Sequence, residues 1–100
     1  MKITIQALGF TAREELLAFV REKVQKLYNL YDKIIECEIV LTLENSSDRQ
    51  NKAAQIRLSV PGNDMLASAQ SKAFEESAML AIEGLERQIE KRKTQETTYS

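Results

Sequence analysis

The sequence predicts a single α+β domain, built as a two-layer sandwich with the element order β-α-β-β-β-α. Apolar and polar residues alternate in four short segments, as they do in strands with one buried face. Two longer segments carry apolar residues at spacings of three and four, the pattern of amphipathic helices. One hundred residues leave room for only one hydrophobic core. Both helices are therefore expected to cover the same face of a four-stranded sheet.

The first strand and the first helix are expected within residues 1–33. The opening segment MKITIQAL alternates apolar and polar residues, and Gly9 follows as a turn residue. Thr11 and Glu14 have the spacing of a capping box, which would begin the helix. The apolar stripe of this helix consists of Leu16, Leu17, Val20, Val24, Leu27 and Tyr31.

Three consecutive strands are predicted next, in residues 34–44, 53–60 and 64–70. The segment 45–51 is polar and is expected to form a loop, and Pro-Gly-Asn at 61–63 predicts a tight turn. Strands with one apolar and one polar face suit an antiparallel arrangement in which one face is solvated. The residues expected on the buried face are Ile35, Cys37, Ile39, Leu41, Leu43, Ala54, Ile56, Leu58, Val60, Met65, Ala67 and Ala69.

A second long helix closes the domain. Ser71 is a candidate cap, and Glu75 and Glu76 would lie near the positive end of the helix dipole. We expect the folded domain to comprise residues 1–93 and residues 94–100 to form a flexible C-terminal tail, because this last segment has no periodicity. The buried stripe consists of Phe74, Ala78, Ile82, Leu85 and Ile89.

Composition argues against catalysis and against a metal site. The chain has no histidine and one cysteine, Cys37, which falls on the buried face of a strand and is interpreted as a small hydrophobe. A Cys/His zinc cluster needs four such ligands. We therefore expect no enzyme, no cofactor and no small-molecule substrate. The lone cysteine suits a cytoplasmic location, and no apolar run approaches the roughly 18 residues of a membrane span.

The basic residues are unevenly placed, although the formal net charge is only −1. One flank of each helix carries cations beside the apolar stripe, and the glutamates Glu83, Glu86 and Glu90 are expected further round the second helix. Two adjacent basic flanks would form a positive groove, in which each cation could neutralise a phosphate. The candidate RNA-binding residues are Lys23, Lys26, Arg87, Lys91, Arg92 and Lys93.

Charge layout alone also allows other interpretations. Cations in the last turn of a helix are common, and many charged faces are simply solvated. An alternative function is a protein-interaction module that uses a sheet edge, or the acidic strand face at Glu36 and Glu38, without RNA. Gly84 lies in the middle of the second helix, where glycine costs about 1 kcal/mol relative to alanine. The close approach of a backbone or a ligand, or close packing by a neighbouring helix, would explain it.

Three segments resemble the ribosome hibernation-promoting factors, a family that includes the ribosome-associated inhibitor of translation. They read AFVREKVQKLYNLYDKI, VPGNDMLASAQ and FEESAMLAIEGLERQIEKRK. The first is similar to the family pattern F-V-x-x-K-x-x-K-L, and the last is similar to L-x-R-Q-L-x-K-x-K. The chain departs from the family at Ala73, Phe74 and Glu75, where many members have Asp-Met-Tyr. It resembles the short form, without the additional C-terminal domain of the long form.

The resemblance implies a fold similar to double-stranded RNA-binding domains. It also implies a ribosome hibernation factor that binds ribosomal RNA in the decoding channel of the small ribosomal subunit and blocks translation during slow growth or stress. The expected partners are the small subunit and its ribosomal RNA, with no membrane and no DNA. The choice between ribosome dimers and idle single ribosomes stays open. The residues that match positions used by the family are Lys23, Lys26, Arg87, Lys91 and Lys93.

Overall fold

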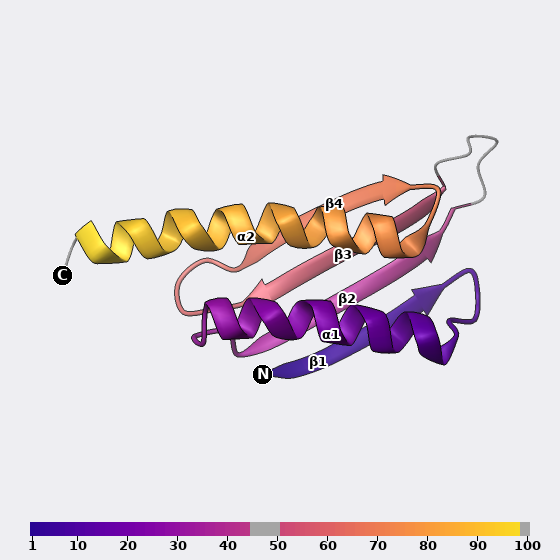
Figure 1. Ribbon diagram of the computed structural model, residues 1–100, viewed down its shortest axis with the longest axis horizontal. Helices are drawn as coiled ribbons and strands as arrows, with labels where there is room; N and C mark the ends of the chain where they lie inside the picture. The colour runs from indigo at the N-terminus through magenta and orange to yellow at the C-terminus, as the bar shows by residue number, and fades with distance from the viewer. Residues whose placement is uncertain (45–50, 99–100) are drawn as a thin grey trace.

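The computed structural model describes residues 1–44 and 51–98, and within them it confirms the α+β class and the element order β-α-β-β-β-α (Figure 1). Almost all of the loop expected at 45–51 lies outside the described residues. The strands are β1 (Lys2–Leu8), β2 (Glu36–Leu43), β3 (Lys52–Ser59) and β4 (Met65–Ser71), and the helices are α1 (Glu14–Leu30) and α2 (Phe74–Thr98).

The four strands form one mixed sheet in the order β1-β2-β3-β4. The pairs β2–β3 and β3–β4 are antiparallel, as the sequence predicts, with Ile39 opposite Ile56 and Ile56 opposite Ala67. Strand β1 lies parallel to β2, with Ile3 beside Cys37. A parallel neighbour needs a crossover connection, and α1 supplies it.

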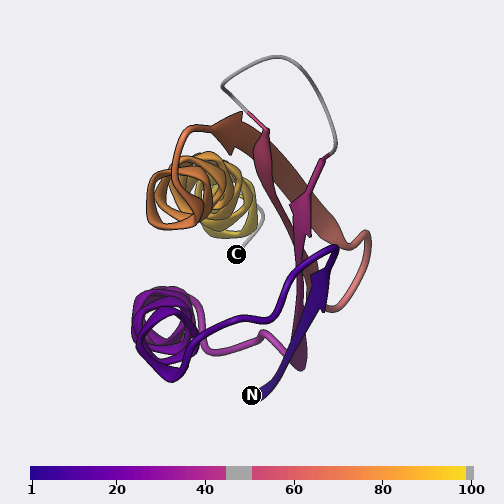
Figure 2. The same ribbon diagram turned by 90° about the vertical axis from the view of Figure 1, so that its right-hand side faces the viewer.

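Both helices lie side by side on one face of the sheet, and the opposite face is uncovered (Figure 2). They begin at the same end of the sheet and run in the same direction, so their C-terminal ends share one end of the molecule (Figure 1). Helix α2 is the longer of the two and projects beyond the sheet at that end. Side chains at the C-terminal ends of both helices can therefore act together.

The core lies between the helices and the sheet, and the predicted stripes account for most of it. The helical residues Val20, Val24, Leu85 and Ile89 are fully enclosed. One prediction is wrong, because Ile35 is 64% exposed. It precedes the first residue of β2, where the alternation of the strand has not begun. The enclosed residue there is its neighbour Ile34, and the remaining core members are Leu27, Tyr31, Cys37, Ile39, Leu41, Ala54, Ile56, Leu58, Val60, Met65, Phe74, Ala78, Ala81 and Ile82.

The start and end of α1 differ from the prediction. Arg13 occupies the N-cap position and makes no side-chain capping hydrogen bond. The capping box expected from Thr11 and Glu14 is therefore wrong. The helix ends at Leu30, and the backbone N–H of Tyr31 donates to the carbonyl of Leu27 at 2.8 Å.

Helix α2 also begins and ends differently from the prediction. Ser71 is the last residue of β4, and its Oγ lies 2.7 Å from Oγ of Ser77 and accepts the backbone N–H of Ala73 at 3.3 Å. It therefore links the strand to the start of the helix instead of capping the first turn. At the other end the helix continues to Thr98, so residues 94–98, expected to belong to a flexible tail, are helical.

Candidate nucleic-acid interface

The described residues offer little chemistry for catalysis or for metal binding. Among residues 1–44 and 51–98, no three histidine, cysteine, aspartate or glutamate side chains come together as a metal site would require. Cys37 is fully enclosed, and burial, with a smaller effect of the charge on Glu38, raises the pKa of its thiol to about 12. The thiol is therefore neutral and inert at physiological pH. No helix in the same residues is long and apolar enough to cross a membrane.

One flank of α1 faces α2 and carries both predicted cations of that helix. Its residues recur at spacings of three and four, and Leu30 lies at its C-terminal end. Leu16 and Leu30, at the two ends of this flank, each line a hollow together with residues of α2, so the flank lies on the α2 side of the helix. Within it, Nζ of Lys23 lies 5.4 Å from the centre of the Phe19 ring, a cation–π distance. The flank consists of Leu16, Phe19, Lys23, Lys26 and Leu30.

The groove between the helices has mixed charge. Beside Leu30 it is lined by Arg87 and by three glutamates of α2, and its volume is about 540 Å³. The prediction of a uniformly positive groove, with these glutamates further round the helix, is therefore wrong. A helical projection gives the angle of a residue from its own apolar stripe, but it does not give the neighbour that each flank will meet. The three glutamates are Glu83, Glu86 and Glu90.

The remaining cations of α2 do not all face α1. Lys91 and Arg92 line a separate hollow beside β4, together with Met65, Gln88 and Gln95. The Nε2 of Gln88 donates to the carbonyl of Leu66 at 2.9 Å, which ties this side of the helix to the strand. Lys91 and Arg92 are therefore turned from the groove towards β4, whereas Arg87 lines the groove.

Gly84 lies on the β4 side of α2 as well. A Cβ atom built at this position would lie 3.4 Å from Cβ of Ala67. The close neighbour of Gly84 is therefore strand β4, which leaves room for a Cβ atom but limits any larger side chain at this position.

Charge is separated along the helices more clearly than across them. The first turns carry Glu14 and Glu15 in α1, and Glu75 and Glu76 in α2. The predicted cations all lie in the C-terminal halves of the two helices. Because the helices run in the same direction, these cations collect towards one end of the molecule (Figure 1). We call this set the basic end: Lys23, Lys26, Arg87, Lys91, Arg92 and Lys93.

The members of the basic end differ in their contacts. Lys26, Arg87 and Lys91 are exposed, and Lys23 is partly buried. None of these four forms an ion pair with any described residue.

The other two members already have protein partners. Arg92 donates from Nη2 to the carbonyl of Asn63 at 2.9 Å and from Nη1 to that of Pro61 at 3.3 Å, and Lys93 donates to the carbonyl of Leu30 at 3.3 Å. Four cations are thus available to a polyanion, and two are engaged within the fold.

The acidic strand face proposed as an alternative site is partly neutralised. Nη1 of Arg57 lies 3.9 Å from Oε2 of Glu38, and Nη2 of Arg57 lies 3.1 Å from Oδ2 of Asp64. All three side chains are substantially exposed, so these pairs contribute little to stability. Strand β2 is also internal to the sheet, so Glu36 and Glu38 do not lie on an edge strand.

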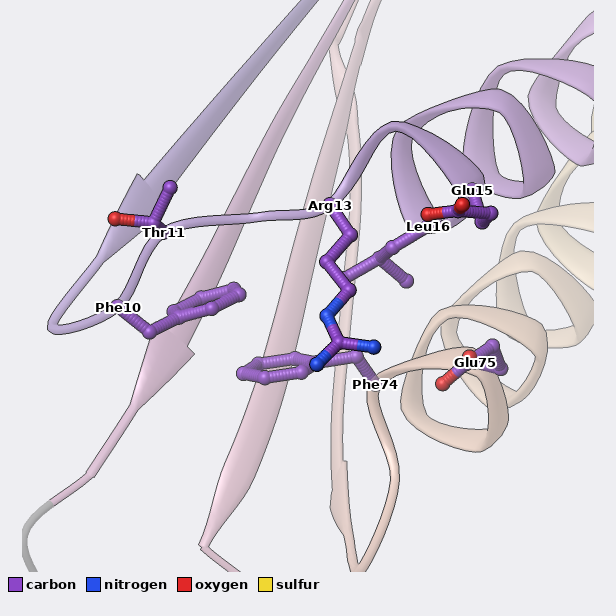
Figure 3. Close-up of a pocket in the computed structure, with 7 residues that line it drawn as sticks. All are labelled: Phe10, Thr11, Arg13, Glu15, Leu16, Phe74 and Glu75. Carbon is purple, nitrogen blue, oxygen red and sulfur yellow. The ribbon is translucent and has the colours of Figure 1, made fainter.

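A hollow at the opposite end of the helices was not anticipated from the sequence. Phe10 and Phe74 stack in it, and Arg13 extends across it towards Phe74 (Figure 3). Phe10 lies in the loop after β1, outside every periodic segment, so periodicity could not have indicated its partner. The complete lining, about 360 Å³ in volume, is Phe10, Thr11, Arg13, Glu15, Leu16, Phe74 and Glu75.

Comparison with protein families identifies the class to which this fold and basic end belong. Residues 3–97 match the model of the family described as sigma 54 modulation protein / S30EA ribosomal protein. The chain belongs to this family, and the resemblance to hibernation-promoting factors is confirmed. Membership indicates a ribosome-associated function and a kind of protein that is not an enzyme. No curated protein sequence matches the chain.

Two solved structures show the same fold at low sequence identity. A ribosomal subunit interface protein from Coxiella burnetii is 21% identical, with a TM-score of 0.82, covering 94% of this chain and 99% of that one. The N-terminal domain of Protein Y from Thermus thermophilus is 18% identical, with a TM-score of 0.76, covering 91% and 98%. At such low sequence identities, these two matches establish only that the chain shares the arrangement of strands and helices with those proteins.

Proposed function

We propose that this protein is a cytoplasmic ribosome hibernation factor. It binds ribosomal RNA in the decoding channel of the small ribosomal subunit and blocks translation during slow growth or stress. The ribosome-associated character of the family supports this role. The more specific partner, RNA of the small subunit, is the proposal.

The proposal is supported chiefly by four cations at the basic end that form no ion pair with any described residue. Lys23, Lys26, Arg87 and Lys91 lie in the C-terminal halves of two helices that run in the same direction, and no described acid pairs with them. A phosphodiester backbone presents negative charges at regular intervals, and each cation that neutralises one releases a counterion. The acidic first turns leave the opposite helix ends unattractive to RNA.

Affinity is expected to come from shape and backbone contacts, as in the recognition of folded RNA generally. The aromatic side chains near the basic end are engaged within the fold. Tyr31 is buried in the core, Tyr28 and Phe19 pack against the core, and the Phe19 ring lies 5.4 Å from the ammonium group of Lys23. With a formal net charge of −1, the rest of the protein adds no general attraction for nucleic acid. Binding should thus be confined to this end.

Co-sedimentation with purified small ribosomal subunits tests the proposal. The wild type should sediment with the subunits at low salt and dissociate steeply as salt rises from about 50 to 200 mM. A variant that replaces Lys23, Lys26, Arg87 and Lys91 by glutamine should lose most of this binding. It should also lower the slope of log K against log salt by about 3, because four phosphate contacts are removed.

A matched variant controls for total charge. It replaces four exposed cations outside the basic end by glutamine: Lys2, Arg13, Arg21 and Lys72. This variant has the same net charge as the first and should bind subunits as the wild type does. Equal loss of subunit binding in both variants would show that binding depends on net charge and not on the basic end. Salt-independent binding would instead favour a protein–protein contact.

A further inference from the structure

We infer that Arg92 and Lys93 are positioning residues, which hold the C-terminal half of α2 at a fixed place relative to α1 and to the β3–β4 turn. The inference rests on the proposed function, because what they position is Lys91 and Arg87 relative to the cations of α1. The sequence predicts both residues to be RNA contacts. Their hydrogen bonds give them a different role.

Arg92 is attached to the turn between β3 and β4. Its guanidinium group donates to the carbonyls of Pro61, at 3.3 Å, and Asn63, at 2.9 Å. Between these two residues Gly62 has a φ of +89°, a left-handed conformation that favours glycine. The turn thus presents two carbonyl oxygens to one planar donor, the geometry for which the fork of an arginine is suited.

The same turn is held from the side of the sheet by a second arginine. Asp64 accepts the backbone N–H of Val60 at 3.4 Å and the Nε–H of Arg57 at 3.2 Å. These two contacts fix the turn to the sheet independently of Arg92. Through this turn, Arg92 connects the projecting part of α2 to a rigid part of the fold.

Lys93 performs the corresponding role towards α1. Its ammonium group donates to the carbonyl of Leu30, the last residue of α1, at 3.3 Å. The last carbonyls of a helix lack partners within the helix and carry its negative dipole charge, so a cation there is stabilising. Helix α1 has no basic residue in its own last turn. Helix α2 supplies that cation from 63 residues further along the chain.

Adjacent residues in a helix point about 100° apart, so Arg92 and Lys93 can reach two different neighbours. Together they fasten α2 on both sides, immediately after Lys91. The distance between Lys91 and the cations of α1 therefore depends on these two contacts. The affinity for an RNA backbone should depend on that distance, because the phosphates of the backbone are regularly spaced.

The salt dependence of binding separates a positioning residue from a phosphate contact. Binding to purified small ribosomal subunits is measured over a salt series for the wild type and for Lys91→Met, Arg92→Met and Lys93→Met. Methionine removes the charge and keeps most of the apolar stem. Lys91→Met should lower the slope of log K against log salt by about 0.7 to 0.9. Arg92→Met and Lys93→Met should leave the slope unchanged and weaken binding by about threefold to tenfold at every salt concentration.

Hydrogen exchange provides the second readout on the same proteins. Arg92→Met should speed amide exchange in the turn at residues 60–64, and Lys93→Met should speed it in the last turn of α1. If methionine unfolds either protein, the conservative variants Arg92→Lys and Lys93→Arg take its place. They should keep the wild-type slope and restore part of the affinity.

Two results would overturn the inference while leaving the proposed function standing. A slope lowered by about one in Arg92→Met or Lys93→Met would make that residue a direct phosphate contact. Faster exchange with unchanged affinity would make it a purely structural residue. If the wild type itself does not bind the subunits, the proposed function fails and takes the inference with it, so the two failures are distinguishable.

Discussion

The rings of Phe10 and Phe74 stack with their centroids 4.3 Å apart and their planes 12° from parallel (Figure 3). This contact joins the loop after β1 to the first residue of α2. The hydrogen bond from Lys93 to Leu30 joins α2 directly to α1 at the other end of the helices. Helix α2 is thus held at both ends, by an apolar contact with the loop before α1 at the acidic end and by polar contacts at the basic end.

Removal of one ring from this stack should destabilise the protein without affecting ribosome binding. Phe10 is partly buried and Phe74 is almost fully enclosed. We expect Phe10→Ala to lower the free energy of unfolding by about 2 kcal/mol, from lost apolar burial together with the lost ring–ring contact. Phe10→Leu, which keeps the burial, should cost about half as much. Urea denaturation measures both, and equal costs for the two variants would contradict a specific role for the stacked rings.

The two glycines with positive φ should differ in their tolerance of alanine. At Gly9, with φ +86°, an added Cβ would lie 2.8 Å from the carbonyl oxygen of Leu43. At Gly62 the nearest atom is Nη1 of Arg92, at 3.8 Å, so alanine there meets only the backbone penalty.

We therefore expect Gly62→Ala to cost about 1 kcal/mol, and Gly9→Ala to cost about 2 to 3 kcal/mol because a steric clash is added. Thermal or urea unfolding would give both values. The reverse order would mean that the loop after β1 moves away from β2 easily.

Gly84 should accept alanine and reject larger residues. The 3.4 Å distance from its added Cβ to Ala67 is an ordinary contact, so Gly84→Ala should raise the free energy of unfolding by up to about 1 kcal/mol through helix propensity. Gly84→Val should destabilise by about 1 to 3 kcal/mol, because its branches enter the space of β4. Both folded variants should bind ribosomal subunits normally. Loss of binding in Gly84→Ala alone would indicate a ligand at this position.

The thiol of Cys37 should cause the free energy of unfolding to fall at alkaline pH. Its pKa is raised from 9.0 to about 12 in the folded protein, so above pH 9 the unfolded chain loses a proton that the folded protein keeps. The stabilisation is present below pH 9 and is lost as pH rises towards 12, at about 1.4 kcal/mol per pH unit.

Comparison with Cys37→Ala isolates this effect from the titration of lysines and tyrosines. The difference in unfolding free energy between the wild type and this variant should shrink between pH 8 and pH 10.5. The native thiol should also resist an aromatic disulfide reagent at pH 8 and react once urea unfolds the chain. Rapid reaction of the folded protein would contradict the burial of Cys37.

Local patterns were sufficient to predict the elements and most of the core. The alternation around Cys37, Ile39 and Leu41 gave the buried face of β2, and all three residues are enclosed. The stripe from Phe74 to Ile89 likewise gave the buried side of α2. These patterns work because burial against a single partner layer imposes the period of the element on the sequence.

The features that were missed depend on contacts between distant segments. Arg92 and Lys93 look like ordinary cations of a last helical turn, and their partners at Pro61 and Leu30 are far away in the sequence. Similarly, the position of Glu86 opposite α1 depends on how the two helices are rotated against each other. No periodicity within one helix contains that information.

We propose that RNA contacts this protein at the basic end of the two helices. Site-specific photocrosslinking to small ribosomal subunits tests it most directly, with the reactive group at Gln95, which is exposed beside Lys91, or at Thr4, which is exposed on the uncovered face of the sheet. We expect crosslinks from Gln95 to ribosomal RNA of the decoding channel and few from Thr4. Crosslinks from Thr4 alone, or from Gln95 only to ribosomal protein, would contradict it.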